Sequence, residues 1–446
     1  MSLAIWMNGE RVGSWRVERG QHHLTYDPAW VASPRGRALS VSLPLTATQA
    51  LRGPVVAHYF DNLLPDNPRI RERIAARYRT GSTRAFDLLQ AIGRDCVGAV
   101  QLLPEDLVPE GWDRIDSAPL REAEIAALLR GAAGDGAQGT AAEGLRISLA
   151  GAQEKTALLR HQGRWRRPLG ATPTTHILKL PLGLAGGSRR VDLADSVENE
   201  WLCALLCHAL GLPVAPAEIW HFEDQKALAV TRFDRALQQH PETGQPWIAR
   251  LPQEDFCQAF GLPPTHKYEQ DGGPGIDACL RLLSGSQDAT DLAGFALTQL
   301  AFWLLAATDG HAKNFSIFLR PGGRYVSTPL YDVLSIHPYV GDGPGQIRWR
   351  QAELAMALRG KNAHYALAGI QARHWQALAA RAGGPAVWAQ MLALVERVEP
   401  ALAQVEPLLP AAFPAHIWDR IAAGLRAQRQ RFLDSLAAAA LSKARE

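Results

Sequence analysis

The segment from Asp309 to Asn314 restricts what this chain can fold into more than any other feature. Its aspartate is followed five residues later by an asparagine, and a second aspartate, Asp332, comes after a strand-like stretch. In this pattern one carboxylate can position an attacking hydroxyl, while an amide oxygen and the second carboxylate hold a metal ion against phosphates. The fold must therefore bring these three residues together. The spacing predicts phosphoryl transfer from Mg-ATP.

Length and composition set the outer limits. A chain of 446 residues exceeds what one hydrophobic core usually serves, so we expect two or more domains. Hydrophobic residues make up 47%, which predicts a globular protein. The net charge of +3 gives no global sign of nucleic-acid binding. A basic run at 69–84 could bind nucleic acid or an acidic partner, but a solvated helical face is the stronger interpretation.

The compartment can be argued from cysteines and from apolar runs. The five cysteines are irregularly spaced, which predicts reduced thiols in a reducing compartment. Residues 1–13 show no basic stretch followed by an apolar core, so we expect no signal peptide. The most apolar run, 295–307, is shorter than the roughly 20 residues a membrane span needs. We therefore expect a buried helix there, no membrane partner and a cytoplasmic protein.

The coarse pattern of elements predicts an α+β chain. Residues 1–105 are expected to form a small α+β subdomain, with a half-buried strand at 39–45. A Gly/Ala-rich connector is expected at 131–144. Residues 140–235 carry strand signals and one helix at 196–210, closed by Gly211 and Pro213. Residues 236–446 are expected to be mainly helical.

A run of small residues before a predicted strand could approach phosphate. Such residues let backbone amides contact phosphate oxygens, but the segment lacks the ending of a Walker A motif. Taken alone, a glycine-containing hairpin turn explains it better. The residues concerned are Ala150, Gly151, Ala152, Gln153, Glu154 and Lys155.

Lys179 ends an apolar strand-like segment and resembles the strand lysine that contacts nucleotide phosphates in kinases. A solvent-facing lysine at a strand edge is the simpler reading of this residue alone. In the following helix, Glu198 and Glu200 are both possible ion-pair partners that would orient the amine. Spacing does not choose between them.

The alternative for Asp309 is a turn at a helix end, with Asp332 as a helix cap. With Lys179, Asp309, Asn314 and Asp332 in the order found in kinases, the functional interpretation becomes stronger. Asp309 would then orient the substrate hydroxyl, and Asn314 and Asp332 would hold Mg²⁺. His311 is expected near the nucleotide and not as a base.

Taken together, these motifs resemble the HipA family of toxin serine/threonine kinases. The strings Ala150 to Lys155 and Asp309 to Asn314 are long and specific, and the matching segments run in family order across about residues 140 to 360. The matching segments are 147–156, 178–181, 199–200, 232–235, 251–255, 267–269, 309–314 and 331–332.

The resemblance implies a two-lobed, protein-kinase-like fold of the HipA type, with an N-terminal α/β lobe and a mainly helical C-terminal lobe. It implies ATP and Mg²⁺ as cofactors, with Arg232 and Phe233 joining the nucleotide site. It also implies that Ser148 is autophosphorylated, which withdraws the phosphate-binding loop. Residues 253–268 would be the activation loop. The family often has an acidic residue where this chain has Thr231, so its nucleotide affinity could differ.

The resemblance implies partners as well. Family members pair with a small helix-turn-helix antitoxin (HipB-like), and the complex represses its operon, with operator DNA bound mainly through the antitoxin. The usual protein substrates are aminoacyl-tRNA synthetases. Two other functions stay open on sequence alone: a catalytically weak or inactive corepressor, and a small-molecule phosphotransferase.

Overall fold

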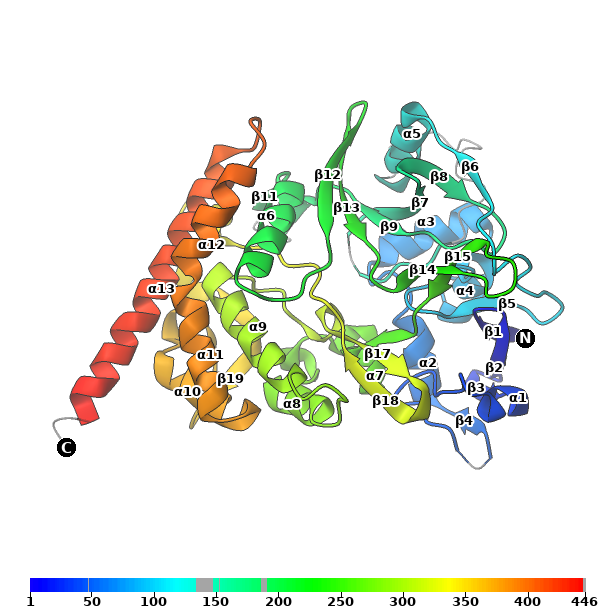
Figure 1. The fold of residues 1–446 in the computed structure, drawn as a ribbon, viewed down its shortest axis with the longest axis horizontal. Coiled ribbons are helices and arrows are strands. Elements are labelled where there is room, and N and C mark those ends of the chain that lie inside the picture. Colours follow the sequence, from blue (N-terminus) through cyan, green and yellow to red (C-terminus); the bar gives the residue numbers. More distant parts are fainter. Residues whose placement is uncertain (47, 134–146, 152, 186–190, 444–446) are drawn as a thin grey trace. The chain divides into compact units, whose positions relative to one another are not determined.

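The chain folds into two compact units, each built from separated stretches of sequence (Figure 1). The computed structural model describes all residues except 47, 134–146, 152, 186–190 and 444–446. Unit 1 comprises Met1–Leu180, Trp220–Lys267 and Ser316–Thr328, and unit 2 comprises Pro181–Ile219, Tyr268–Phe315 and Pro329–Glu446. The domain boundaries expected from the sequence stay a prediction, and most of the expected connector lies outside the described residues.

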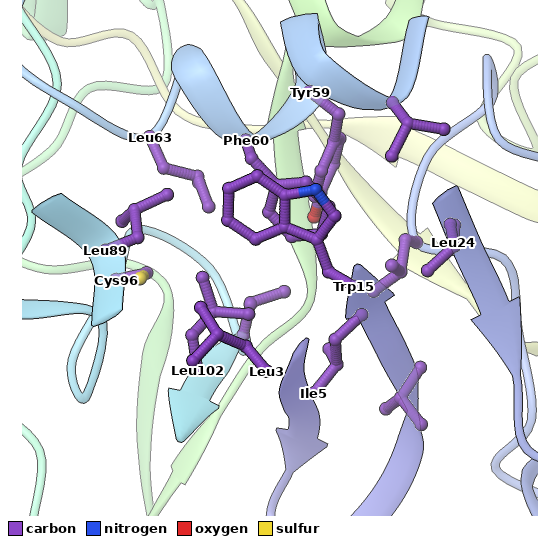
Figure 2. Close-up of a cluster of buried hydrophobic side chains, with 14 of the residues drawn as sticks. Leu3, Ile5, Trp15, Leu24, Tyr59, Phe60, Leu63, Leu89, Cys96 and Leu102 are labelled. Carbon is purple, nitrogen blue, oxygen red and sulfur yellow. The ribbon is translucent and has the colours of Figure 1, made fainter. Parts of the chain in front are cut away.

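Unit 1 begins with an antiparallel sheet of order β4-β3-β2-β1-β5. Its core is centred on Trp15, whose ring stacks on Phe60 at 3.9 Å between centroids (Figure 2). The Trp15 ring also meets Phe86 edge-on. Stacked and edge-on aromatic pairs add to the stabilisation from burial. The elements here are β1 (Ser2–Met7), β2 (Glu10–Glu18), β3 (Gln21–Tyr26), α1 (Pro28–Ala32), β4 (Ala50–Arg52), α2 (Pro54–Asp61), α3 (Pro68–Tyr78), α4 (Ala85–Ile92) and β5 (Gln101–Pro104).

A second sheet has the order β12-β13-β9-β7-β8-β6 and belongs to unit 1 except for the start of β12. Apolar residues of helix α5 and of this sheet share one core, which includes Leu129, Leu158 and Leu178. Strand β9 lies between β13 and β7, so Lys179 stands in the middle of the sheet. The elements are β6 (Ser117–Pro119), α5 (Glu122–Ala133), β7 (Lys155–His161), β8 (Arg164–Pro168), β9 (His176–Lys179), β12 (Ala217–Phe222) and β13 (Gln225–Thr231).

Two smaller sheets complete unit 1. The hairpin of β14 and β15 follows β13, and β16 pairs with β17, which pairs with β18. Asp255 and Gln258 form a capping box that starts α7 directly after β16. The elements are β14 (Arg235–Gln239), β15 (Pro246–Arg250), β16 (Gln253–Asp255), α7 (Phe256–Ala259), β17 (Ser316–Arg320) and β18 (Arg324–Ser327).

Unit 2 is mainly helical and is organised around α9. Trp303 of α9 is fully buried and packs against Trp375 and Phe432 of two other helices. Among the described residues, no helix combines the length and the apolar character needed to cross a membrane. The elements are β10 (Gly183–Ala185), β11 (Val191–Leu193), α6 (Ser196–Ala209), α8 (Ile276–Leu283), α9 (Asp291–Leu305), β19 (Glu353–Arg359), β20 (Ala363–Ala366), α10 (Ala372–Ala382), α11 (Pro385–Glu396), α12 (Val398–Val405) and α13 (Ala415–Lys443).

One expectation about the elements is wrong, the strand at 39–45. Residues 39–45 alternate in sequence, but Val41 and Leu45 are exposed and the segment forms one isolated bridge. Side chains bind several of its backbone groups. The Tyr26 hydroxyl accepts a hydrogen bond from the Leu39 amide and donates one to the Leu43 carbonyl, in place of a neighbouring strand. The stretch after residue 255 also contains the strands β17 to β20. The helix expected at 196–210 is confirmed as α6.

Buried His337 predicts a pH effect on stability. Burial lowers its pKa to about 4, and its Nε2 lies 3.0 Å from the Leu304 carbonyl. An unfolded chain would protonate this ring near pH 6.5, before the folded chain does. The free energy of unfolding is therefore expected to fall between about pH 6.5 and pH 4, by at most about 3 kcal/mol from this group. Urea denaturation across this range should show a smaller decrease in the free energy of unfolding for His337→Gln than for the exposed control His208→Gln. Equal decreases in the two variants would contradict this role of His337.

Candidate active site

The loop after α9 holds the Asp309 side chain in solvent, while the neighbouring residues of the loop are buried. Helix α9 ends at Leu305 and is capped by Ala306, which takes the left-handed conformation at φ 49°. The loop then closes through bonds from the His311 amide to the Asp309 carbonyl and from the Asn314 amide to the His311 carbonyl. The Asp309 side chain is 60% exposed, whereas His311 and Asn314 are buried. One carboxylate is thus held out on a rigid support, as general base chemistry requires.

Asn314 and Asp332 have features that fit a cation. The Asn314 Nδ2 donates to the Asp309 carbonyl at 2.7 Å, which leaves the amide oxygen for a metal. Asp332 holds a left-handed backbone at φ 62°, a costly conformation that often marks functional positions. The preceding Tyr331 donates its hydroxyl to the Lys313 carbonyl and so ties this segment to the catalytic loop. Among the described residues no cluster of three His, Cys, Asp or Glu side chains could hold a metal ion, but Mg²⁺ commonly uses one or two carboxylates plus phosphates.

Tyr268 lies directly on the catalytic loop. Its hydroxyl donates to Oδ1 of Asp309, and its ring meets His311 edge-on with centroids 4.9 Å apart. His311 Nε2 is 3.9 Å from the same Asp309 oxygen. His311 is therefore a close neighbour of the carboxylate.

Gly310 predicts a stability effect in this loop. A Cβ at this position would lie 2.4 Å from the ring of Phe302, so the loop or the ring must move. Gly310→Ala is expected to lower the free energy of unfolding by about 1–3 kcal/mol, as overpacking does. Gly294→Ala is the matched control, because a Cβ there meets nothing within 4 Å and alanine favours a helix. Urea denaturation of both variants checks this, and a Gly310→Ala protein as stable as the wild type would contradict it.

In unit 1 the predicted phosphate loop is anchored on the segment before α3 and on Asp95, which follows α4. The Ser148 amide donates to the Asp95 carbonyl, and its fully buried hydroxyl donates to the Leu63 carbonyl at 2.7 Å. Further along, the Asp66 amide donates to the Gly151 carbonyl at 3.1 Å. Gly151 has φ 101°, which favours glycine. Backbone bonds from two places thus hold the loop.

Two arginines of the expected basic run form ion pairs within unit 1. Arg71 pairs with Asp61, and Arg73 pairs with Glu154 of the loop. The interpretation of this run as a simple solvated face is therefore incomplete, since these two side chains are partly buried partners of acids.

Two lysines of unit 1 stand side by side. Lys155 of β7 is the register partner of Lys179 of β9, so both side chains point to the same face of the sheet. The Nζ of Lys155 lies 2.7 Å from where a Cβ on Gly151 would be, so its side chain reaches back to the loop. Like charges placed directly opposite each other cost stability unless an anion offsets them. Glu154 and Gln153 join the loop to Leu180 through hydrogen bonds with its amide and carbonyl.

Arg232 belongs to a buried ionic cluster with Asp95 at its centre. Asp95 accepts bonds from Thr174 and lies within 3.4 Å of the guanidinium groups of three arginines, Arg232, Arg235 and Arg250. Arg232 also binds Asp234 through two nitrogens. The Arg232 guanidinium is thus enclosed by protein partners.

Burial alone would raise the pKa of Asp95, but the three arginines outweigh it and hold this pKa well below its usual range. Burial likewise lowers the pKa of Arg250 to about 10. Phe233, the next residue in sequence after Arg232, meets Phe318 edge-on at 5.7 Å.

The two units gather different parts of the predicted site. Unit 2 brings together Asp309, His311 and Asn314, with Asp332 tied in through Tyr331. Unit 1 brings the loop and Lys179 together. Ala152 lies outside the described residues, and Ala150 lies in the anchored loop. Glu198 and Glu200 are both buried in the first turns of α6, and the choice between them stays open.

Sequence reasoning missed Asp95 and the bond from Tyr268. The three arginines at 232, 235 and 250 were a signal that some buried acid must balance them, because buried charges need partners. The chain offered no local sign of which acid it was. Thr231, the departure from the family pattern, places its hydroxyl 3.4 Å from His176 Nε2.

The chain is similar to known proteins over most of its length. Residues 147–405 match the family model for the HipA-like C-terminal domain, and residues 3–103 match that for the HipA N-terminal domain. The Y4mE protein of Sinorhizobium fredii is 34% identical over 90% of this chain and 91% of its own. The serine/threonine-protein kinase toxin HipA of Shewanella oneidensis is 28% identical over 76% and 75%.

A solved structure shares the fold. It is the complex of HipA, HipB and operator DNA from Shewanella oneidensis, which aligns with a TM-score of 0.77 over 97% of each chain at 24% identity. The α+β architecture with a mainly helical second unit agrees with this likeness.

Proposed function

Because the chain belongs to the HipA family, we propose that it is a Mg-ATP-dependent serine/threonine protein kinase that acts as the toxin of a toxin–antitoxin pair. The observation that carries the proposal is the geometry of the loop after α9. An exposed Asp309 carboxylate is held by a buried, hydrogen-bonded loop in which the Asn314 amide nitrogen donates to the Asp309 carbonyl. This arrangement supplies a base and a cation ligand side by side, as phosphoryl transfer needs.

Each residue of unit 2 has a proposed role. Asp309 orients the acceptor hydroxyl and takes its proton, while the hydroxyl oxygen forms a bond to the γ-phosphorus of ATP and ADP leaves. Asn314 and Asp332 hold Mg²⁺, which neutralises charge on the phosphates when it is bound. His311 lies near the nucleotide. Catalysis rests on positioning and on charge neutralisation.

Unit 1 supplies the nucleotide contacts in this proposal. The loop from Ala150 to Lys155 covers the phosphates, and the paired ammonium groups of Lys155 and Lys179 offset their charge. Arg232 and Phe233 contribute through their backbone and through the ionic cluster that fixes the end of β13.

Ser148 is the proposed autophosphorylation site and off-switch. Its hydroxyl is fully buried and bound to the Leu63 carbonyl. A phosphate there would lose this donor and place nearly two negative charges in a buried position without room for them. The modified segment therefore has to move out of its buried position, and the phosphate loop that follows it in sequence moves with it.

The proposed partners are an antitoxin and a protein target. A small helix-turn-helix antitoxin like HipB would neutralise the toxin, and operator DNA would be bound mainly through that antitoxin. The solved Shewanella oneidensis complex, which contains HipA, HipB and operator DNA, supports this by similarity. The proposed substrate is an aminoacyl-tRNA synthetase, whose modification in the cytoplasm would arrest translation.

Expression in a bacterial host tests this function. The wild-type chain without an antitoxin should arrest growth, and co-expression of the neighbouring helix-turn-helix gene should restore it. Asp309→Asn should abolish the arrest, with equal protein levels confirmed by immunoblot. Arrest that persists in Asp309→Asn would contradict a kinase toxin. Operator repression without any arrest would favour a kinase-like corepressor.

A further inference from the structure

A pocket of about 430 Å³ opens beside Asp309 within unit 2. Its lining includes Tyr268, Gln270 and Asp271 from one stretch of the chain and residues 351–355 from another. Ile336, Ile347 and Leu354 give it an apolar part, and Thr308 and Asp309 also line it. The proposed base is therefore part of the lining of a concave site. We name this site the acceptor pocket.

The hydroxyl of Tyr268 marks where an accepting hydroxyl can sit. Its O–H donates to Oδ1 of Asp309, which is the bond that a serine or threonine must make to the base before transfer. Tyr268 itself lines the pocket. A bound peptide that follows the pocket would reach the carboxylate at the position that this phenol occupies.

The charge of the acceptor pocket is entirely negative. Its lining contains the carboxylates of Asp271, Asp309 and Glu353, and no lysine, arginine or histidine occurs among the described lining residues. The side chains of Asp271 and Glu353 are exposed and form no ion pair with described residues; Glu353 only accepts a bond from Gln270 Nε2 at 3.0 Å. The neighbouring Glu269 differs, because Arg359 pairs with it.

We propose that the acceptor pocket docks the substrate segment and selects a lysine or arginine next to the serine or threonine that is phosphorylated. The proposal rests on the proposed kinase function, because it assigns Asp309 as the base. Two uncompensated carboxylates beside that base attract a cation on the bound segment. The apolar lining contacts the peptide. The hydrogen bond from the Tyr268 hydroxyl to Asp309 is replaced by one from the accepting serine or threonine hydroxyl.

Peptide binding, measured apart from phosphate transfer, tests the proposal. Three fluorescent synthetic peptides share one serine and differ only in whether its neighbours are Lys, Ala or Glu. Fluorescence anisotropy with the full chain should rank their affinities Lys above Ala above Glu. Asp271→Asn and Glu353→Gln should each lower the affinity for the Lys peptide, relative to the Ala peptide, by about fivefold, which is the scale of one exposed ion pair. Glu353→Lys should shift the preference toward the Glu peptide.

The control is Glu396→Gln, which removes an exposed carboxylate of the same unit outside the pocket and should leave the ranking unchanged. Tyr268→Phe should strengthen binding of the Lys peptide, because the hydroxyl that competes for Asp309 is gone. Weaker binding would contradict the claim that the Tyr268 hydroxyl and the acceptor hydroxyl occupy the same position. Equal affinities, no binding of any peptide, or a Lys preference that survives in the Asp271→Asn/Glu353→Gln double variant would each overturn the proposal.

Transfer is scored separately with Mg-ATP. Charge-dependent binding at this pocket without phosphate transfer to any peptide or to the chain itself would contradict the kinase function and not the pocket's charge preference. Transfer that shows no charge preference would contradict the pocket and leave the kinase function standing.

Discussion

Asp309→Asn is expected to lower the rate of phosphate transfer by about 10²- to 10⁴-fold, the usual contribution of a positioned base. The amide keeps the size of the side chain but cannot take the proton of the acceptor. The side chain is 60% exposed, and its neighbours are Tyr268 and His311, so the variant should melt like the wild type. Transfer from radiolabelled ATP to the chain or to a peptide, together with a thermal melt, checks both statements.

The matched control for this change is Asp342→Asn. Asp342 is an exposed aspartate in a loop of the same unit, outside the catalytic loop. Its substitution should leave transfer unchanged. Full activity in Asp309→Asn, or an equal loss in both variants, would contradict the role of Asp309 as the base.

Asp95→Asn is expected to lower the free energy of unfolding by about 3–5 kcal/mol, as the loss of one partner from a buried ion pair does. The carboxylate faces Arg232, Arg235 and Arg250, so its removal leaves these guanidinium groups to repel one another. Asp234 still pairs with Arg232 and Arg235. Urea denaturation measures the change. Asp106→Asn, at an exposed aspartate of unit 1 without such partners, is the control and should be nearly neutral.

The same cluster gives a pH dependence with a definite sign. The arginines hold the pKa of Asp95 below its unfolded value of about 3.9, despite its burial. Its stabilisation is therefore fully present above about pH 4 and is lost as the pH falls toward the lower folded pKa. The difference in stability between wild type and Asp95→Asn should shrink below pH 4. A difference that is small at pH 7 would contradict the account of the cluster.

Local patterns predicted the parts of the site that are continuous in sequence. The end of α9, the turn at Asp309 and the helix closed by Gly211 follow from apolar runs and stop signals within a few residues. The spacing of Asp309 and Asn314 fixes their bond in the structure, since both lie in one closed loop. The strand that ends in Lys179 was likewise visible as a short apolar run.

Long-range pairing limits what the sequence can predict. Asp95 meets Arg232 and Arg235 from more than a hundred positions away, and no local pattern marks such a partner. The segment at 39–45 has the sequence alternation of a strand, but the Tyr26 hydroxyl forms hydrogen bonds with the Leu39 amide and the Leu43 carbonyl in place of a neighbouring strand. The acceptor pocket draws its walls from three distant stretches, so only the folded unit shows it.

The most direct test of the kinase account is the mass of the purified wild-type chain after incubation with Mg-ATP, followed by peptide mapping. The account predicts one added phosphate on Ser148, absent from Asp309→Asn treated in parallel. A chain that binds no ATP and gains no phosphate, on itself or on any protein of a bacterial lysate, would contradict it.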